Sequence, residues 1–295
     1  MITLPGSLGG FYRVTIKRRD GSTRYQSHWM PNIITNAGLD RFGQGDFMSN
    51  CRVGTGTTTP HPEDNALVQE AASTSSRANE AASAEQYPPY AGTRSVDFTF
   101  PEGTFNSNLN LSEVGVGWSS QLFSRALFVD INGNTTSVTV LSDEILVIRY
   151  KLYNYAPTED VVFTRTLQDG QTVTCTARAA QVRAGSQATG WGIRNGNHSG
   201  DRCHAYSGDI GDIQDGPSGS ASDVSLGAAS YEHGSFSRVY AATWSLSQAN
   251  FDGGIRSVRF RTSGRGVYQV QFDPPIPKTN DYLLALSFQV SWARA

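Results

Sequence analysis

Alternating strand segments joined by short turns are the feature that most constrains how this chain can fold. Residues 11–18 alternate loosely, with Tyr12, Val14 and Ile16 on one side and their neighbours on the other. Asp20-Gly21 follows, and residues 24–29 resume the extended pattern. Alternation, an Asp-Gly pair and renewed alternation predict a β-hairpin.

Three further hairpins are expected along the chain. One joins residues 161–166 to 172–176 through Asp169-Gly170, and another joins 138–141 to 145–153. The last joins residues 255–261 to 267–272, with Gly264 and Gly266 at the turn, and a loosely alternating strand covers 282–292. Repeated hairpins of this kind are typical of antiparallel sheets.

The expected fold class is mainly β, with antiparallel β-sandwich-like domains, long loops and few short helices. A boundary near Ala156-Pro157 divides the chain into an N-terminal β domain (1–157) and a loop-rich C-terminal β domain (158–295). One short helix is expected over 36–42, with Asn36 as its N-cap. Residues 70–92 and 181–231 are expected to form long loops, of the kind that is usually functional or held by a partner.

Composition excludes several classes of protein. The net charge of −2 gives no support to a nucleic-acid partner. The sequence contains no run of eighteen apolar residues, so it does not predict a membrane-spanning helix. The first residues lack the pattern of a signal peptide. Three widely spaced cysteines do not form a disulfide framework, which indicates folding in a reducing cytoplasm. Charged residues make up only 17% of the chain, a proportion that suits surfaces covered by partners.

Acidic residues in the run GDIGDIQDG are the strongest metal candidates. Asp209, Asp212 and Asp215 could supply oxygen ligands to calcium from one flexible loop. The run lacks the spacing of an EF-hand, and a solvated turn is the alternative. Cys203-His204 matches no zinc spacing. No cofactor is expected.

Aromatic residues in the expected loops are candidates for an interface or a ligand. Tyr87, Tyr90, Trp191 and Tyr206 could stack on sugars or anchor a partner, with core packing as the alternative. Tyr153, in an expected strand, is assigned to the core.

Motifs for catalysis are absent from the sequence. There is no GxSxG elbow, no complete phosphate loop, and no stretch that points to paired carboxylates. The chain is therefore not expected to be an enzyme.

Five segments of the first half carry a resemblance when taken in order. They are NIITNAGLD (32–40), CRVGTGTTTP (51–60), NLSEVGVGW (110–118), LFSRAL (122–127) and the strand that begins SDE (142–144). Their order resembles a family of tailed-bacteriophage tail and baseplate-associated structural proteins. The resemblance covers roughly residues 10–155.

That resemblance implies a structural virion protein of the tail end, in the baseplate, tail tip or tail fibre. It implies synthesis in the host cytoplasm, other tail proteins as partners, and a homo-oligomer, a trimer or hexamer, because tail parts have such symmetry. It implies no catalytic residues. A receptor-binding module that recognises host surface glycan is the alternative, and an envelope-degrading enzyme is the third hypothesis.

One charged residue in an apolar strand also allows a prediction. Glu113 shares the parity of Leu111, which favours a buried carboxylate, with a position on the solvent face of the alternation as the alternative. A buried carboxylate requires a partner, and Arg125 in the next strand is the expected one.

Overall fold

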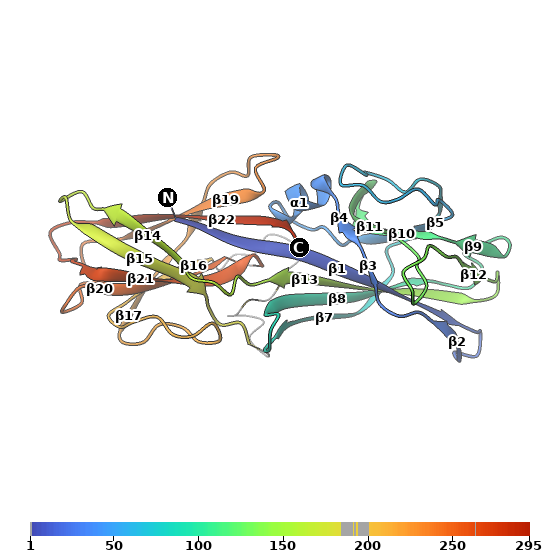
Figure 1. The fold of residues 1–295 in the computed structure, drawn as a ribbon, viewed down its shortest axis with the longest axis horizontal. Helices are drawn as coiled ribbons and strands as arrows, with labels where there is room; N and C mark the ends of the chain where they lie inside the picture. Colours follow the sequence, from blue (N-terminus) through green and yellow to red (C-terminus); the bar gives the residue numbers. More distant parts are fainter. Residues whose placement is uncertain (1, 184–190, 192, 194–200, 263) are drawn as a thin grey trace.

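The computed structural model describes residues 2–183, 191, 193, 201–262 and 264–295. The molecule is mainly β, as expected, and its strands build two β-sandwiches placed end to end (Figure 1). All strand pairs are antiparallel in the described chain except β1 with β22, which run parallel.

One long mixed sheet runs through both sandwiches, in the order β18-β19-β22-β1-β13-β8-β7, with β2 and β3 also pairing with β1. Its strands are β18 (Gly227–Ala228), β19 (Ser237–Trp244), β22 (Leu284–Arg294), β1 (Ile2–Lys17), β13 (Ile145–Tyr155), β8 (Ala91–Phe100), β7 (Arg77–Glu85), β2 (Thr23–Gln26) and β3 (Met30–Pro31).

The first region is the sandwich on the right of Figure 1. Here β1, β13, β8 and β7 face a five-stranded sheet in the order β4-β11-β10-β5-β6. Its strands are β4 (Ile33–Ile34), β11 (Gln121–Leu127), β10 (Glu113–Trp118), β5 (Asn50–Gly54) and β6 (Glu70–Thr74). A two-stranded sheet, β9 (Leu109–Leu111) with β12 (Val138–Val140), lies at the outer end.

The second region is the sandwich on the left of Figure 1. Here β19, β22 and the start of β1 face a six-stranded sheet in the order β14-β15-β21-β20-β16-β17. Its strands are β14 (Val161–Thr166), β15 (Thr172–Ala179), β21 (Gly266–Ile276), β20 (Ile255–Thr262), β16 (Arg202–Tyr206) and β17 (Ala221–Ser225).

Strand β1 belongs to both regions. Its residues Ile2 to Leu8 pair with β22, and Ser7 to Lys17 pair with β13. Even-numbered side chains point inward: Leu4 lies in the core of the second region, and Tyr12 in the core of the first. The expected boundary at Ala156-Pro157 falls between β13 and β14, but the shared sheet crosses it.

Three of the four expected hairpins are confirmed: β1 with β2, β14 with β15, and β20 with β21. The expected pairing of residues 138–141 with 145–153 is wrong. Strand β12 pairs with β9, while β13 pairs with β1 and β8. Residues 145–153 do form an alternating strand, but alternation does not specify the neighbouring strands, and a central strand can pair with segments far away in the sequence.

Helix α1 (Asn36–Phe42) is confirmed, but its N-cap is Thr35 rather than Asn36. Thr35 has extended backbone angles and its hydroxyl accepts the Gly38 N–H at 2.8 Å. The side chain of Asn36 instead accepts a hydrogen bond from Arg294. The helix covers β11 in the first region.

The expected long loop at 70–92 is largely wrong, and the one at 181–231 is wrong in part. Residues 70–92 form β6, β7 and the start of β8, because the edges of β5 and β8 supply the pairing that their polar sequence did not predict. Within 181–231, β16, β17 and β18 are strands. Residues 184–190, 192 and 194–200 lie outside the described part of the chain.

Candidate functional site

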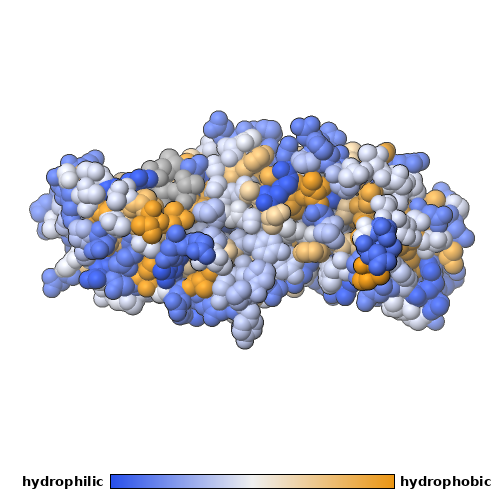
Figure 2. Space-filling view, in the orientation of Figure 1, coloured by the Kyte–Doolittle hydropathy of each residue, from blue (hydrophilic) through white to orange (hydrophobic). Residues whose placement is uncertain are grey.

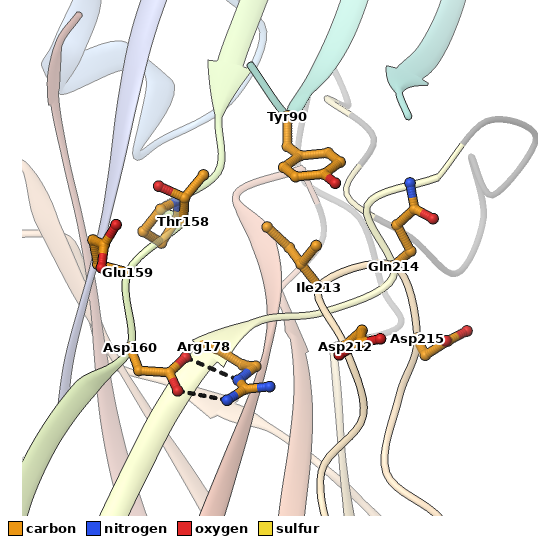
Figure 3. Close-up of a pocket in the computed structure, with 10 residues that line it drawn as sticks. Tyr90, Thr158, Glu159, Asp160, Arg178, Asp212, Ile213, Gln214 and Asp215 are labelled. Atoms are coloured by element: carbon orange, nitrogen blue, oxygen red, sulfur yellow. Dashed lines mark hydrogen bonds and ion pairs between the residues drawn. The ribbon is translucent and has the colours of Figure 1, made fainter. Parts of the chain in front are cut away.

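A cleft of about 570 Å³ opens where the second region meets the end of β13 and β8, and we call it the junction cleft (Figure 3). Tyr90 and Ile213 form its apolar part, and both pack against the core of the second region. The rest of its lining is polar and mostly acidic: Thr158, Glu159, Asp160, Arg178, Asp212, Gln214 and Asp215, with Pro157 beside them.

Arg178 and Asp160 form a two-point ion pair in this cleft. The Nε and Nη2 atoms of Arg178 donate to the two carboxylate oxygens of Asp160 at 2.9 and 2.5 Å. The third guanidinium nitrogen donates to the Gly211 carbonyl at 3.3 Å. This hydrogen bond connects the ion pair to residues 208–216, the GDIGDIQDG run, which we call the acidic loop. Figure 3 shows the pair on one wall and Asp212 and Asp215 on the other.

The acidic loop itself is held by neutral amides. Gln269, which is fully buried, donates to the carbonyls of Gly211 and Asp212 at 2.8 and 3.1 Å and accepts the Gly211 N–H at 3.0 Å. Gln271 accepts the Ile210 N–H at 2.9 Å and donates to Asp209 at 2.8 Å. Backbone geometry thus sets where the carboxylates of this loop point.

The three calcium candidates do not converge. Asp209 is engaged by Arg256 at 2.9 Å, and these hydrogen bonds from Arg256 and Gln271 lower the pKa of its carboxyl group. Asp212 and Asp215 line the junction cleft, and Asp215 lies 3.8 Å from Arg183. Within the described residues, no three His, Cys, Asp or Glu side chains gather in a geometry that could hold a metal ion.

The four aromatic candidates separate into two buried and two accessible residues. Trp191 is fully buried, donates to the Asn154 carbonyl at 2.9 Å, and packs edge-on against Tyr268. Tyr206 is only 7% exposed, with Arg259 over its ring. These two are core residues. Tyr90 lines the cleft, and Tyr87, at 74% exposure, stands free at the surface.

An aromatic face that the sequence analysis missed lies on the outer side of β1 and β13. Tyr153, expected in the core, points outward and stacks on Tyr155 with ring centroids 5.6 Å apart. Phe11 packs edge-on against Tyr153, and the Lys151 ammonium lies 4.6 Å from the Tyr153 ring. Phe11, Lys151 and Tyr153, together with Trp29, line a hollow of about 260 Å³. The strict alternation of 145–155 was the signal that could have revealed it, because odd-numbered residues oppose the buried set.

Glu113 and Arg125 form the buried pair expected from the sequence. Arg125 donates to one Glu113 oxygen from Nε and Nη2, at 3.1 and 2.9 Å, and to Asp64 at 2.7 Å. Glu113 also accepts the N–H groups of Gly56, Val68 and Gln69. The cluster therefore fixes the segment from residue 55 to 69 against β10 and β11.

The cysteines are all buried thiols without disulfides, as expected. Burial raises the pKa of each thiol, to about 11 for Cys175, so these groups stay protonated and unreactive near neutral pH.

Comparisons with family models, curated proteins and solved structures gave no match for this chain. The described part of the fold contains no helix of the length and apolar character that crossing a membrane requires.

Proposed function

We propose that this protein is a non-enzymatic structural component of a bacteriophage tail end, in the baseplate, tail tip or tail fibre. It assembles with copies of itself, as a trimer or hexamer, and with neighbouring tail proteins. It is made in the host cytoplasm and works in the virion. The proposal begins from the resemblance of residues 10–155 to tail and baseplate-associated proteins.

The observation that carries the proposal is that the segments with this resemblance fold into one packed unit. The first segment contains β4 and most of α1, and the second contains most of β5. The next two segments form β10 and β11. These strands are neighbours in the five-stranded sheet, and the Glu113–Arg125 pair joins them. Motifs that pack together in space support a shared module better than motifs scattered over a fold.

The shape of the molecule also suits assembly. Two sandwiches share one continuous sheet, so β1 joins them by backbone pairing rather than by a flexible linker. Arg265, just before β21 of the second region, also connects the two regions. Its guanidinium donates hydrogen bonds to the carbonyls of Phe42 and Gly43, at the end of α1 in the first region, at 3.2 and 2.9 Å. An elongated unit of this kind keeps its two ends at a set spacing.

The experiment is the mass of the purified protein in solution, together with its position in intact particles by cryo-electron microscopy. A trimer or hexamer, and density for this fold at the tail end, is the expected result. A monomer that mass spectrometry does not find in purified particles would overturn the proposal.

A second candidate function is recognition of host surface glycan, and the junction cleft is the observation that favours it. An aromatic ring beside carboxylate, guanidinium and amide groups offers both a stacking surface and partners for sugar hydroxyls. Glycan-array binding that is lost in Tyr90→Ala and kept in Tyr87→Ala would support it. Equal binding by the two variants, or none by the native protein, would count against it.

A further inference from the structure

A small hollow lies on the outer side of β1 and β13, and we call it the aromatic hollow. Its lining consists of Phe11, Trp29, Lys151 and Tyr153, and its volume is about 260 Å³. Phe11 lies on β1, opposite Lys151 of β13 on one side and Pro31 of β3 on the other. The hollow therefore sits on three neighbouring strands of the continuous sheet, at a position set by backbone pairing.

The rings around the aromatic hollow are held in place by their neighbours. Tyr153 stacks on Tyr155 with ring centroids 5.6 Å apart and an angle of 9° between the planes, and the Lys151 ammonium lies 4.6 Å from the Tyr153 ring. The guanidinium of Arg13 lies over Trp29, 4.8 Å from the centre of its ring. Because these contacts use faces of both rings, the hollow suits an inserted side chain better than a stacked sugar. Its walls are already ordered, so little freedom is lost when a side chain enters.

Charge around the aromatic hollow is unbalanced. On this side of the sheet, Arg149 pairs with Asp97. Lys151 pairs with Glu85. Arg13 forms no ion pair with any of the described residues. One cation beside the hollow is therefore in excess, and a partner that brings a carboxylate complements it.

The most exposed large apolar side chain among the described residues is that of Ile131, at 80%. It lies in the turn between β11 and β12, and a β-bridge closes this turn at its base. The Asp130 carboxylate accepts the N–H groups of Asn132 and Asn134, both at 2.9 Å, which holds the turn in one shape. These hydrogen bonds, above all that from Asn134, lower the pKa of Asp130, so its carboxylate is charged at neutral pH. A rigid turn thus presents one aliphatic side chain beside one negative charge.

Apolar surface on the molecule is divided into small areas. Figure 2 shows separate apolar patches among polar groups on the face in view, and not one continuous apolar face. A surface of that kind binds a partner through a few anchoring side chains that fill pockets. The Ile131 turn and the aromatic hollow match as such an anchor and its pocket. The aliphatic side chain meets apolar walls, and the carboxylate of Asp130 meets the excess charge of Arg13.

We propose that Ile131 of one copy of this chain inserts into the aromatic hollow of a second copy, with Asp130 placed beside Arg13. Every copy carries both the turn and the hollow, so each copy both donates an anchor and accepts one. The inference deepens the proposed assembly role and rests on it for the existence of a homo-oligomer. It adds the two surfaces that meet.

The test uses the full chain and sedimentation equilibrium, with two variants at exposed positions. Ile131→Glu removes the anchor and leaves the hollow intact. Trp29→Ser removes one wall of the hollow, at a residue that is 36% exposed, and leaves the anchor intact. Each variant alone is expected to raise the dissociation constant of the oligomer at least tenfold, because no complete pair of surfaces remains.

An equimolar mixture of the two variants is the sharpest sample. The intact hollow of the Ile131→Glu chain accepts the intact anchor of the Trp29→Ser chain, so one complete contact returns and mixed complexes form. Leu246→Glu, at a position of the second region that is 47% exposed, is the matched control and keeps the native association. Thermal denaturation verifies that all three variants are folded.

Three results would overturn the inference: a native protein that stays monomeric, native-like association of either single variant, and a mixture that associates no better than its components. Association that survives in both variants would place the contact between copies elsewhere and leave the aromatic hollow to a different partner. The particle experiment judges the proposed function separately. A chain found at the tail end whose copies meet through other surfaces contradicts this inference and not the proposed function.

Discussion

The first region fixes its long surface loop through a buried ion pair, whereas the second fixes its acidic loop through the amides of Gln269 and Gln271 and through partly exposed arginines. Residues 55–69 are held by Glu113, Arg125 and Asp64, and both Glu113 and Arg125 are essentially inaccessible to solvent. The acidic loop of the second region is held by Gln269 and Gln271. Removal of one partner of a buried ion pair strongly lowers the free energy of unfolding, because it leaves an unpaired charge in the core. Removal of an amide costs less, because it leaves only neutral hydrogen-bonding groups without partners.

The regions also differ in how completely their cores are closed. In the first region, the five-stranded sheet covers the inward face of β1 and β13, whose inward residues such as Ile148 are fully buried. In the second region, the side between β14 and β22 leaves core-contacting residues partly exposed. The core of the first region is therefore covered more completely than the core of the second.

The largest expected effect comes from Arg125→Met, which leaves the Glu113 carboxylate buried without its cation. We expect a loss of about 4 kcal/mol in the free energy of unfolding, measured by urea denaturation. The double variant Glu113→Gln/Arg125→Met should lose less, because no charge is then stranded. Arg202→Met breaks an exposed pair of the second region with Asp223 and should change stability by about 0.5 kcal/mol or less. Equal losses in the two single variants would contradict the comparison.

Trp191→Ala tests how much the packing between the two regions contributes to stability. The indole packs on Tyr268 of the second region and donates to Asn154 of β13, so truncation leaves a cavity and an unpaired carbonyl. We expect a loss of about 3 kcal/mol in guanidinium denaturation. Tyr87→Ala, at an exposed position, is the control and should be nearly neutral. No loss of stability in Trp191→Ala would show that Trp191 is not a core residue, and Trp191 would again be a candidate for ligand binding.

Gln269→Leu keeps the volume of a buried side chain but removes its amide. The Gly211 N–H loses its acceptor, and the carbonyls of Gly211 and Asp212 each lose one of their two donors, so we expect a loss of about 2 kcal/mol. The half-buried Gln271→Leu should cost less, because water can reach the groups it leaves. Thermal denaturation of both variants checks the order, and the reverse order would show that the acidic loop is anchored elsewhere.

The smallest expected effect is a pH dependence in the second region. Burial and the nearby Arg259 lower the pKa of His204 to about 4, below its usual value near 6.5. The unfolded chain therefore binds the extra proton first, and stability falls as the pH drops from about 6.5 toward 4. In His204→Phe that part of the decline disappears, a difference of about 1 kcal/mol at pH 4 in urea denaturation, since solvent screens this half-buried ring. An unchanged profile in His204→Phe would show that the imidazole titrates normally.

Local patterns were sufficient for much of the fold. Asp-Gly turns between alternating segments determined two hairpins, since turn and strands are neighbours in the chain. Arg125 was the expected partner of Glu113, and the structure confirms the pair; the parity with Leu111 was not the reason, because Leu111 belongs to β9 and residues of both parities are buried from 111 to 117. Polar segments such as β7 escaped prediction because the edge of β8, and not their own composition, makes them strands.

The candidate site was predictable only in part. Tyr90, Asp212 and Asp215 were singled out from the sequence, and the structure brings them into one cleft with Arg178 and Asp160. Asp209, Trp191 and Tyr206 were grouped with them but lie elsewhere, in an ion pair or in the core. Loop composition says which side chains are polar or aromatic, but not which way the backbone turns them.

The sequence by itself determined the mainly β class and the alternation of buried positions in β1 and β13, because both depend on spacing along the chain. Only the tertiary structure decided that β1 serves both sandwiches and that β12 pairs with β9 rather than with β13. These outcomes depend on which strands meet across a sheet, and that choice is made between segments far apart in sequence.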